Sequence, residues 1–144
     1  MKAIDTHILV YAHRPDVKWH EAAKRFLGAC ASGKEPWAIP FHCLVEFAAV
    51  VSNRRLWLQP SSPVNIRDQV DAWLESPTLE VLSDERGSWK VLAELMEQGR
   101  VEGGAIHDAR IAACCLFNGV SQLCTLDRDF SRFPQLKTVN PLAT

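Results

Sequence analysis

Short apolar segments alternate with longer helical patterns along this chain, and that alternation constrains its fold more than any other feature. Helical patterns separate the first four predicted strands, and such an order favours parallel strand pairing through right-handed crossovers. We therefore expect an α/β fold with a mostly parallel sheet. The predicted strands are a short one ending at Ile4, then Trp37–Pro40, Leu79–Leu82, Val120–Leu126 and Leu136–Val139.

The segments between these strands carry apolar residues at helical spacing. We interpret Pro60–Pro63 as a loop inside one domain, because no repeat, low-complexity tract or linker divides the chain. A single domain over residues 1–144 is therefore expected. The first predicted helix begins near Thr6, and the second covers Trp19–Leu27, with Gly28 and then Ser32–Lys34 expected to end it. The other predicted helices are Leu44–Val51, Val64–Leu74, Trp89–Met96 and Ala105–Ala113.

The composition limits the possible cellular compartments and classes of protein. The 47% hydrophobic and 23% charged residues are ordinary for a globular domain. Asp5 interrupts the start where a signal peptide needs an apolar stretch, and no apolar run approaches the ~20 residues that span a bilayer. The five cysteines form no Cys-x-x-Cys pair and are interpreted as small buried residues. We expect a cytoplasmic protein without a membrane segment.

Four acidic residues occupy positions that the fold should bring together. Asp5 and Asp127 follow predicted strands, while Glu46 and Asp108 lie early in helices that start from the same edge of the sheet. Ligands of open α/β sheets bind outside the carboxyl ends of the strands. We therefore expect these four carboxylates, distant in sequence, to converge at that edge.

Converging carboxylates need a compensating cation. Two of them 4 Å apart repel by roughly 4 kcal/mol at an effective dielectric constant near 20. Hard oxygen ligands without a Cys or His cluster favour Mg²⁺ or Mn²⁺ over Zn²⁺. Such an ion activates water for attack on phosphorus and stabilises the leaving oxygen. The pattern predicts metal-dependent hydrolysis of a phosphodiester.

Each acid also has a structural interpretation. Asp5 fits a helix cap, Asp127 an Asx-turn, Glu46 a solvated helix face, and Asp108 a helix N-terminus. Taken singly, each position favours that structural role. Their joint placement at one edge of the sheet favours the metal site.

Other polar residues receive supporting or structural roles. Thr125 is expected to hydrogen-bond a carboxylate or a metal-bound water. Asp129 is a possible substitute metal ligand, but the sequence around it favours a role as the cap of the following turn. The net charge of −1 indicates no general affinity for nucleic acid, so RNA binding would need a local basic rim. Candidates for that rim are Arg14, Lys18, Arg54, Arg55, Arg110, Arg128 and Arg132. No histidine has metal-binding spacing, so none is assigned a catalytic role among His7, His13, His20, His42 and His107.

Four ordered segments resemble the PIN-domain family, and within it the VapC-type toxins of type II toxin–antitoxin pairs. They are Asp5–Ala12, Glu46-Phe47, His107–Ala113 and Thr125–Phe130, and the similarity extends over nearly the whole chain. By this resemblance Asp5, Glu46, Asp108 and Asp127 correspond to the metal-binding acids, in that order. Thr125 corresponds to the hydroxyl that precedes the fourth acid, and Thr6 supports the first. His7 stands where the family often has Asn.

The resemblance implies a three-layer α/β/α sandwich and an endoribonuclease that uses one or two Mg²⁺ or Mn²⁺ ions. It also implies inhibition by a VapB-type antitoxin and formation of a homodimer. Apolar residues near Trp57-Leu58 and on the helix over Val64–Leu74 are candidates for the antitoxin groove, with core packing as the alternative.

The expected mechanism uses water as the nucleophile, so cleavage should leave a 5′-phosphate and a 3′-hydroxyl. Asp5, Asp108 and Asp127 would hold the metal, while Glu46 would complete its shell or deprotonate the water. Two other functions remain open. One is a metal-dependent, structure-specific DNA nuclease, and the other is a catalytically silent nucleic-acid-binding module with an acidic metal pocket.

Overall fold

The computed structural model describes residues 1–143; Thr144, the last residue of the predicted domain, lies outside the described residues. Its centre is a five-stranded sheet in the order β3-β2-β1-β4-β5, and every strand pair is parallel. The predicted α/β fold with a parallel sheet is confirmed. The strands are β1 (Lys2–Ile4), β2 (Trp37–Pro40), β3 (Leu79–Leu82), β4 (Gln122–Cys124) and β5 (Lys137–Val139).

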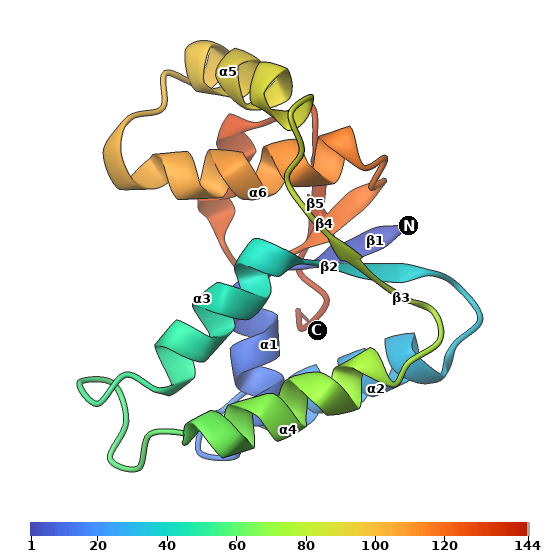
Figure 1. Cartoon of the computed structure of the whole chain (residues 1–144), viewed down its shortest axis with the longest axis vertical. Coiled ribbons are helices and arrows are strands. Elements are labelled where there is room, and N and C mark those ends of the chain that lie inside the picture. The colour runs from blue at the N-terminus through green and yellow to red at the C-terminus, as the bar shows by residue number, and fades with distance from the viewer. Residues whose placement is uncertain (144) are drawn as a thin grey trace.

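Helices cover both faces of the sheet, so the molecule has the expected three layers. Figure 1 shows α5 and α6 on one side of the strands and α1 to α4 on the other. None of the helices within residues 1–143 is long and apolar enough to cross a membrane. The helices are α1 (Thr6–His13), α2 (His20–Ser32), α3 (Phe41–Val51), α4 (Pro63–Leu74), α5 (Ser88–Gly99) and α6 (Ile106–Phe117), with short 3₁₀ helices η1 (Gly103–Ala105) and η2 (Arg128–Arg132).

Several helices extend beyond their predicted bounds, most clearly α2 and α6. Helix α2 continues through Gly28 to Ser32, so the prediction that Gly28 begins its end is wrong. A glycine inside a helix costs only about 1 kcal/mol, and packing of the apolar face outweighs that cost. Helix α6 continues to Phe117, and Gly119 (φ +72°) then turns the chain toward β4.

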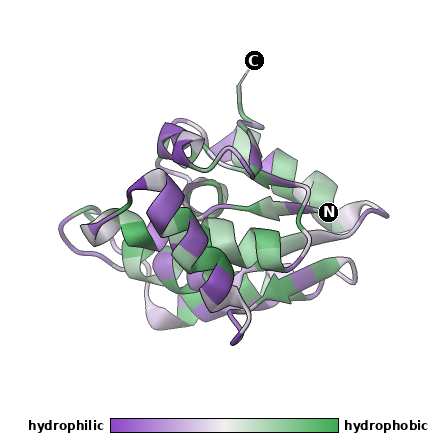
Figure 2. Cartoon of the chain, turned by 90° about the horizontal axis from the view of Figure 1, so that it is seen from above, coloured by the Kyte–Doolittle hydropathy of each residue, from purple (hydrophilic) through white to green (hydrophobic). Residues whose placement is uncertain are grey.

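The core lies around the two central strands. Ala3 and Ile4 of β1, and Trp37 and Ile39 of β2, are fully buried. In Figure 2 hydrophobic residues gather on the strands and central helices, whereas hydrophilic residues lie mostly on outer helices and loops. All five cysteines are buried and unpaired, as their apolar surroundings indicated. A buried central strand gives the residue at its carboxyl end, Asp5, a rigid support.

Candidate metal centre

Asp5 lies at the end of the central strand and caps the first helix. Its Oδ1 accepts a 2.8 Å hydrogen bond from the Thr6 N–H, and its Oδ2 accepts one of 2.6 Å from the Thr125 hydroxyl. Burial raises the pKa of Asp5, and the bonds from Thr125 and Thr6 oppose that rise. The structural interpretation of Asp5 as a helix cap therefore holds. The same carboxylate still lies at the sheet edge where the other acids gather.

Glu46 lies in the second turn of α3, beside Asp5. The Thr6 hydroxyl donates to Glu46 Oε1 at 3.2 Å, while the backbone N–H of Thr6 is bonded to Asp5. Thr6 thus links the first two predicted site residues. Glu46 is more exposed than Asp5, with a side-chain exposure of 39%.

Asp127 follows β4 after two intervening residues and caps η2. Its Oδ1 accepts a 2.8 Å hydrogen bond from the Asp129 N–H, which is the predicted Asx-turn. Its own N–H donates to the Thr125 hydroxyl oxygen at 3.0 Å. Because that hydroxyl donates to Asp5, Thr125 joins the ends of β1 and β4 through side-chain contacts.

Asp108 lies in the first turn of α6 and completes the group of acids. Carboxylate oxygens of Asp108, Asp127 and Asp129 all lie within 4.8 Å of one another. Burial raises the pKa of Asp108 to about 6, with further contributions from the charges of Asp127, Asp5, Asp129 and Glu46. The charges of all four other carboxylates therefore contribute to the raised pKa of Asp108. Asp5 and Glu46 lie outside the three-acid group.

The third member of the group, Asp129, was only a possible substitute ligand in the sequence analysis, where the turn cap was favoured. Asp129 was interpreted as a turn cap, but Asp127 caps η2 and the Asp129 carboxylate faces the other acids instead. The i, i+2 spacing of two acids at a strand end was the available signal. That spacing brings both carboxylates together only because η2 turns the chain immediately.

Comparison with known proteins places this arrangement in a family. A model of the PIN domain matches residues 2–136. The chain belongs to the PIN domain family. Over 142 residues it is 35% identical to the VapC ribonuclease Mb2897 of Mycobacterium bovis, a match that covers 99% of this chain and 96% of the relative. Ribonuclease VapC25 of Mycobacterium tuberculosis is 26% identical over 141 residues, covering 98% of this chain and 99% of the relative.

Solved structures of PIN domain proteins share the fold. The toxin–antitoxin pair VapBC2 of Rickettsia felis, bound to promoter DNA, aligns with a TM-score of 0.68 at 22% identity, covering 96% of each chain. FitAcB of Neisseria gonorrhoeae aligns with a TM-score of 0.71 at 17% identity, covering all of both chains. At these identities the likeness shows the fold.

The acids of this PIN domain suit a hard divalent cation. The group consists of carboxylates alone, and oxygen ligands without thiolate or imidazole favour Mg²⁺ or Mn²⁺. Burial, together with the negative charges of the neighbouring acids, raises the pKa of Asp108. A cation among Asp108, Asp127 and Asp129 would remove this repulsion.

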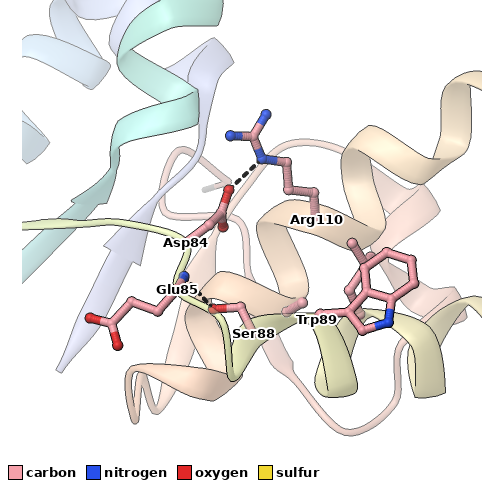
Figure 3. A pocket seen from close by; sticks show the side chains of 7 residues that line it. Asp84, Glu85, Ser88, Trp89 and Arg110 are labelled. Atoms are coloured by element: carbon pink, nitrogen blue, oxygen red, sulfur yellow. Dashed lines mark hydrogen bonds and ion pairs between the residues drawn. The ribbon is translucent and has the colours of Figure 1, made fainter.

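A hydrogen-bonded group near Glu46 was not predicted from the sequence, although one of its members, Arg110, was a candidate for the basic rim. Arg110 Nη1 donates to His42 Nδ1 at 3.0 Å. Figure 3 shows the second contact of this side chain, in which Arg110 Nε donates to Asp84 Oδ2 at 2.6 Å. His42 Nε2 lies 3.4 Å from Glu46 Oε1. Burial and the adjacent Arg110 lower the pKa of His42. The i, i+4 spacing of His42 and Glu46 was visible in the sequence, but the link to Arg110 requires the first turn of α3 to lie near α6.

The predicted basic rim loses Arg14, and a second member, Arg110, is held by neighbouring side chains. Arg14 is buried, pairs with both carboxylate oxygens of Asp16 at 2.9 and 2.6 Å, and lies 4.2 Å from the ring centre of Trp57. Including Arg14 in that rim was therefore wrong, because its guanidinium anchors a loop. Arg110 is held by Asp84 and His42. The exposed candidates are Lys18, Arg54, Arg55, Arg128 and Arg132.

Proposed function

We propose that this protein is a metal-dependent endoribonuclease and the toxin of a VapBC-type toxin–antitoxin pair. Membership of the PIN domain family and 35% identity to a VapC ribonuclease along the whole chain support this function. The observation that carries the metal dependence is the acid group, in which Asp108, Asp127 and Asp129 offer oxygens within 4.8 Å of one another. Asp5 and Glu46 border that group.

We propose that Asp108, Asp127 and Asp5 hold one or two Mg²⁺ or Mn²⁺ ions, with Asp129 as a further ligand. A bound ion of this kind lowers the pKa of the attacking water and stabilises the leaving oxygen of the phosphodiester. Thr125 holds Asp5 and the Asp127 backbone in register, so that both acids keep a fixed spacing. This support limits the motion of the acids during turnover.

Glu46 has a separate part in the proposed reaction. Its side chain is the more exposed of the two acids bonded to Thr6, so it can reach water at the mouth of the site. We assign Glu46 the acceptance of a proton from the attacking water, or completion of the metal shell. Because the nucleophile is water and not the 2′-hydroxyl of the RNA, the products carry a 5′-phosphate and a 3′-hydroxyl.

The proposed partner is a VapB-type antitoxin that covers exposed apolar residues near α4. Leu58 is fully exposed, and Leu56 and Val64 are more than half exposed. Arg14 fixes the loop that carries the two leucines through its hydrogen bond to the Gln59 carbonyl, 2.8 Å long. Leu58→Ser should weaken antitoxin binding without loss of ribonuclease activity, as measured by calorimetry and by RNA cleavage. Equal affinity for both proteins would place the antitoxin elsewhere.

Three further expectations complete the proposal. The chain acts as one domain over residues 1–144, forms a homodimer, and works in the cytoplasm, where its RNA substrate is found. Light scattering of the purified protein at several concentrations tests the dimer. A mass of one chain at all concentrations would rule it out.

The central test is cleavage of total cellular RNA by the purified, antitoxin-free chain. Parallel reactions contain Mg²⁺, Mn²⁺ or excess EDTA, and Asp5→Asn serves as the control for contaminating nucleases. Discrete fragments with 5′-phosphates, dependent on metal and on Asp5, are expected. A 2′,3′-cyclic phosphate would contradict water as the nucleophile. Cleavage of flapped DNA, with RNA left intact, would favour a DNA nuclease.

A further inference from the structure

His42 has a buried ring nitrogen without a hydrogen-bond partner close to the carboxylate of Glu46, among the residues that the structure describes. The residue lies in the first turn of α3, four residues before Glu46, and only 14% of its side chain is exposed. Its Nε2 is buried without a hydrogen-bond partner in the part of the chain that the structure describes. The same atom lies 3.4 Å from Glu46 Oε1, within ion-pair distance but without hydrogen-bond alignment. A small rotation of either side chain would complete the bond.

The opposite ring nitrogen determines which atom carries the proton. Arg110 Nη1 lies 3.0 Å from His42 Nδ1. A guanidinium group only donates hydrogen bonds, so Nδ1 must accept and its ring proton must reside on Nε2. The N–H bond therefore faces the carboxylate of Glu46.

Two further contacts hold this arrangement. Asp84, in the loop after β3, accepts from Arg110 Nε at 2.6 Å and so orients the guanidinium, as Figure 3 shows. The ring of His107 stacks on His42 with its centre 5.7 Å away and an angle of 10° between the planes. A cavity of about 230 Å³ borders His42, Asp84 and Arg110, so close packing alone does not fix the imidazole.

We propose that His42 is a positioning residue for Glu46, with its tautomer fixed by Arg110 and Asp84. Both Thr6 and His42 approach the same oxygen of Glu46, Oε1. Donors on Oε1 leave Oε2 free to face the metal or the attacking water. This inference rests on the proposed ribonuclease function, because it assigns a partner to one of its acids.

Three substitutions of His42 distinguish the effect of its hydrogen-bond donor from the effect of its side-chain volume. His42→Gln keeps an N–H near the position of Nε2. His42→Asn keeps a polar group near the position of Nδ1, toward Arg110, but none near Nε2. His42→Leu keeps a side chain of similar volume without either polar group. We expect His42→Gln to cleave RNA within about threefold of wild type, and His42→Asn and His42→Leu to lose about tenfold or more, the value of a hydrogen bond to a charged group. Thermal unfolding confirms that each variant is folded.

A double-mutant cycle tests whether His42 acts through Glu46. In a Glu46→Ala background, His42→Leu should cause no further loss of activity, because no carboxylate is left to orient. Asp84→Asn should reduce cleavage, whereas Asp68→Asn, at the exposed Arg67–Asp68 pair, should not. An undiminished effect of His42→Leu without Glu46 would overturn the positioning role.

Two measurements without turnover keep this inference distinct from the proposed function. Nitrogen NMR of ¹⁵N-histidine-labelled, metal-free protein should find the His42 proton on Nε2, and Arg110→Met should give a mixture of tautomers. Mn²⁺ titration calorimetry should give weaker binding for His42→Leu than for His42→Gln. Absence of RNA cleavage by wild type would reject the ribonuclease alone. A proton on Nδ1 would overturn the role of His42. Equal Mn²⁺ affinity in both variants would overturn any effect of His42 on the metal shell.

Discussion

The hydroxyl of Thr125 donates a 2.6 Å hydrogen bond to Oδ2 of the buried Asp5, across a sequence separation of 120 residues. The same oxygen accepts the Asp127 N–H at 3.0 Å. Beside these contacts, the Asp5 N–H donates to the Cys124 carbonyl at 2.9 Å. The carboxyl ends of β1 and β4 are thus joined through both backbone and side chains, and the spacing of two site acids depends on one hydroxyl group.

Replacing Thr125 with valine should damage both stability and activity. The substitution keeps the shape of the side chain but leaves the buried Asp5 carboxylate without a donor, at a cost of about 1–3 kcal/mol in the free energy of unfolding. Urea denaturation measures this loss, and RNA cleavage should fall in parallel. Thr138→Val on the exposed strand β5 is the matched control and should change stability by less than about 0.5 kcal/mol. Equal stability of the two variants would contradict the role of Thr125.

Asp5→Asn should abolish cleavage while leaving the metal-free protein folded. Burial raises the pKa of Asp5, which means that the folded state disfavours its charged form. A neutral amide of the same size avoids that cost, although it loses one acceptor oxygen. We expect the free energy of unfolding at pH 7 to stay within about 1 kcal/mol of wild type. Residual metal-dependent cleavage by this variant would show that Asp5 is dispensable as a ligand.

The titration of Asp108 should make the stability of the metal-free protein depend on pH. Its pKa rises from 3.8 to about 6 on folding, so the folded state binds more protons than the unfolded state between those values. The free energy of unfolding should therefore fall as pH rises from about 4 to about 6, and then level off. Solvent screening of the partly exposed side chain limits this contribution to about 1–2 kcal/mol.

The comparison that isolates Asp108 is wild type against Asp108→Asn in the presence of EDTA. Asp16, whose pKa is lowered by its bond to Arg14, contributes the opposite slope in both proteins and cancels in the difference. In urea unfolding between pH 4 and pH 7.5, the free energy of unfolding of Asp108→Asn relative to that of wild type should increase as pH rises. Parallel curves would mean that Asp108 titrates normally.

The sequence allowed the strands and the edge of the site to be predicted, because both depend on local patterns. Trp37–Pro40 and Leu79–Leu82 are short, mostly apolar segments that follow a proline closely, and both match the strands. The helix cap at Asp5 was predictable, because an acid between a strand and a helical pattern is a favoured N-cap. Its role as a metal ligand stays a prediction. The agreement between predicted and observed bounds at these two strands shows that a local sequence pattern can be enough to locate a strand.

The remaining features depend on packing between elements. The contact of His42 with Arg110 joins residues 68 positions apart and exists only where α3 and α6 approach each other. Arg14 looked like a surface cation, yet the following loop folds back so that Trp57 and Asp16 surround it. Neither arrangement leaves a periodic signal in the sequence, since each joins residues that are brought together only by the tertiary fold.

Divalent metal should stabilise the folded protein through the acid group. An ion that binds only the folded state raises the free energy of unfolding by about 2.7 kcal/mol at a concentration 100 times its dissociation constant. Thermal unfolding at pH 7 should therefore shift upward with Mg²⁺ or Mn²⁺, compared with sodium chloride of the same ionic strength. Asp108→Asn should shift less, because it removes one of three oxygens that lie within 4.8 Å of one another. Asp68→Asn, on exposed α4, should respond as wild type does. If Asp108→Asn and wild type gained equal stability from the metal, the ion would bind elsewhere on the surface, and the acids at the carboxyl edge of the sheet would need another explanation.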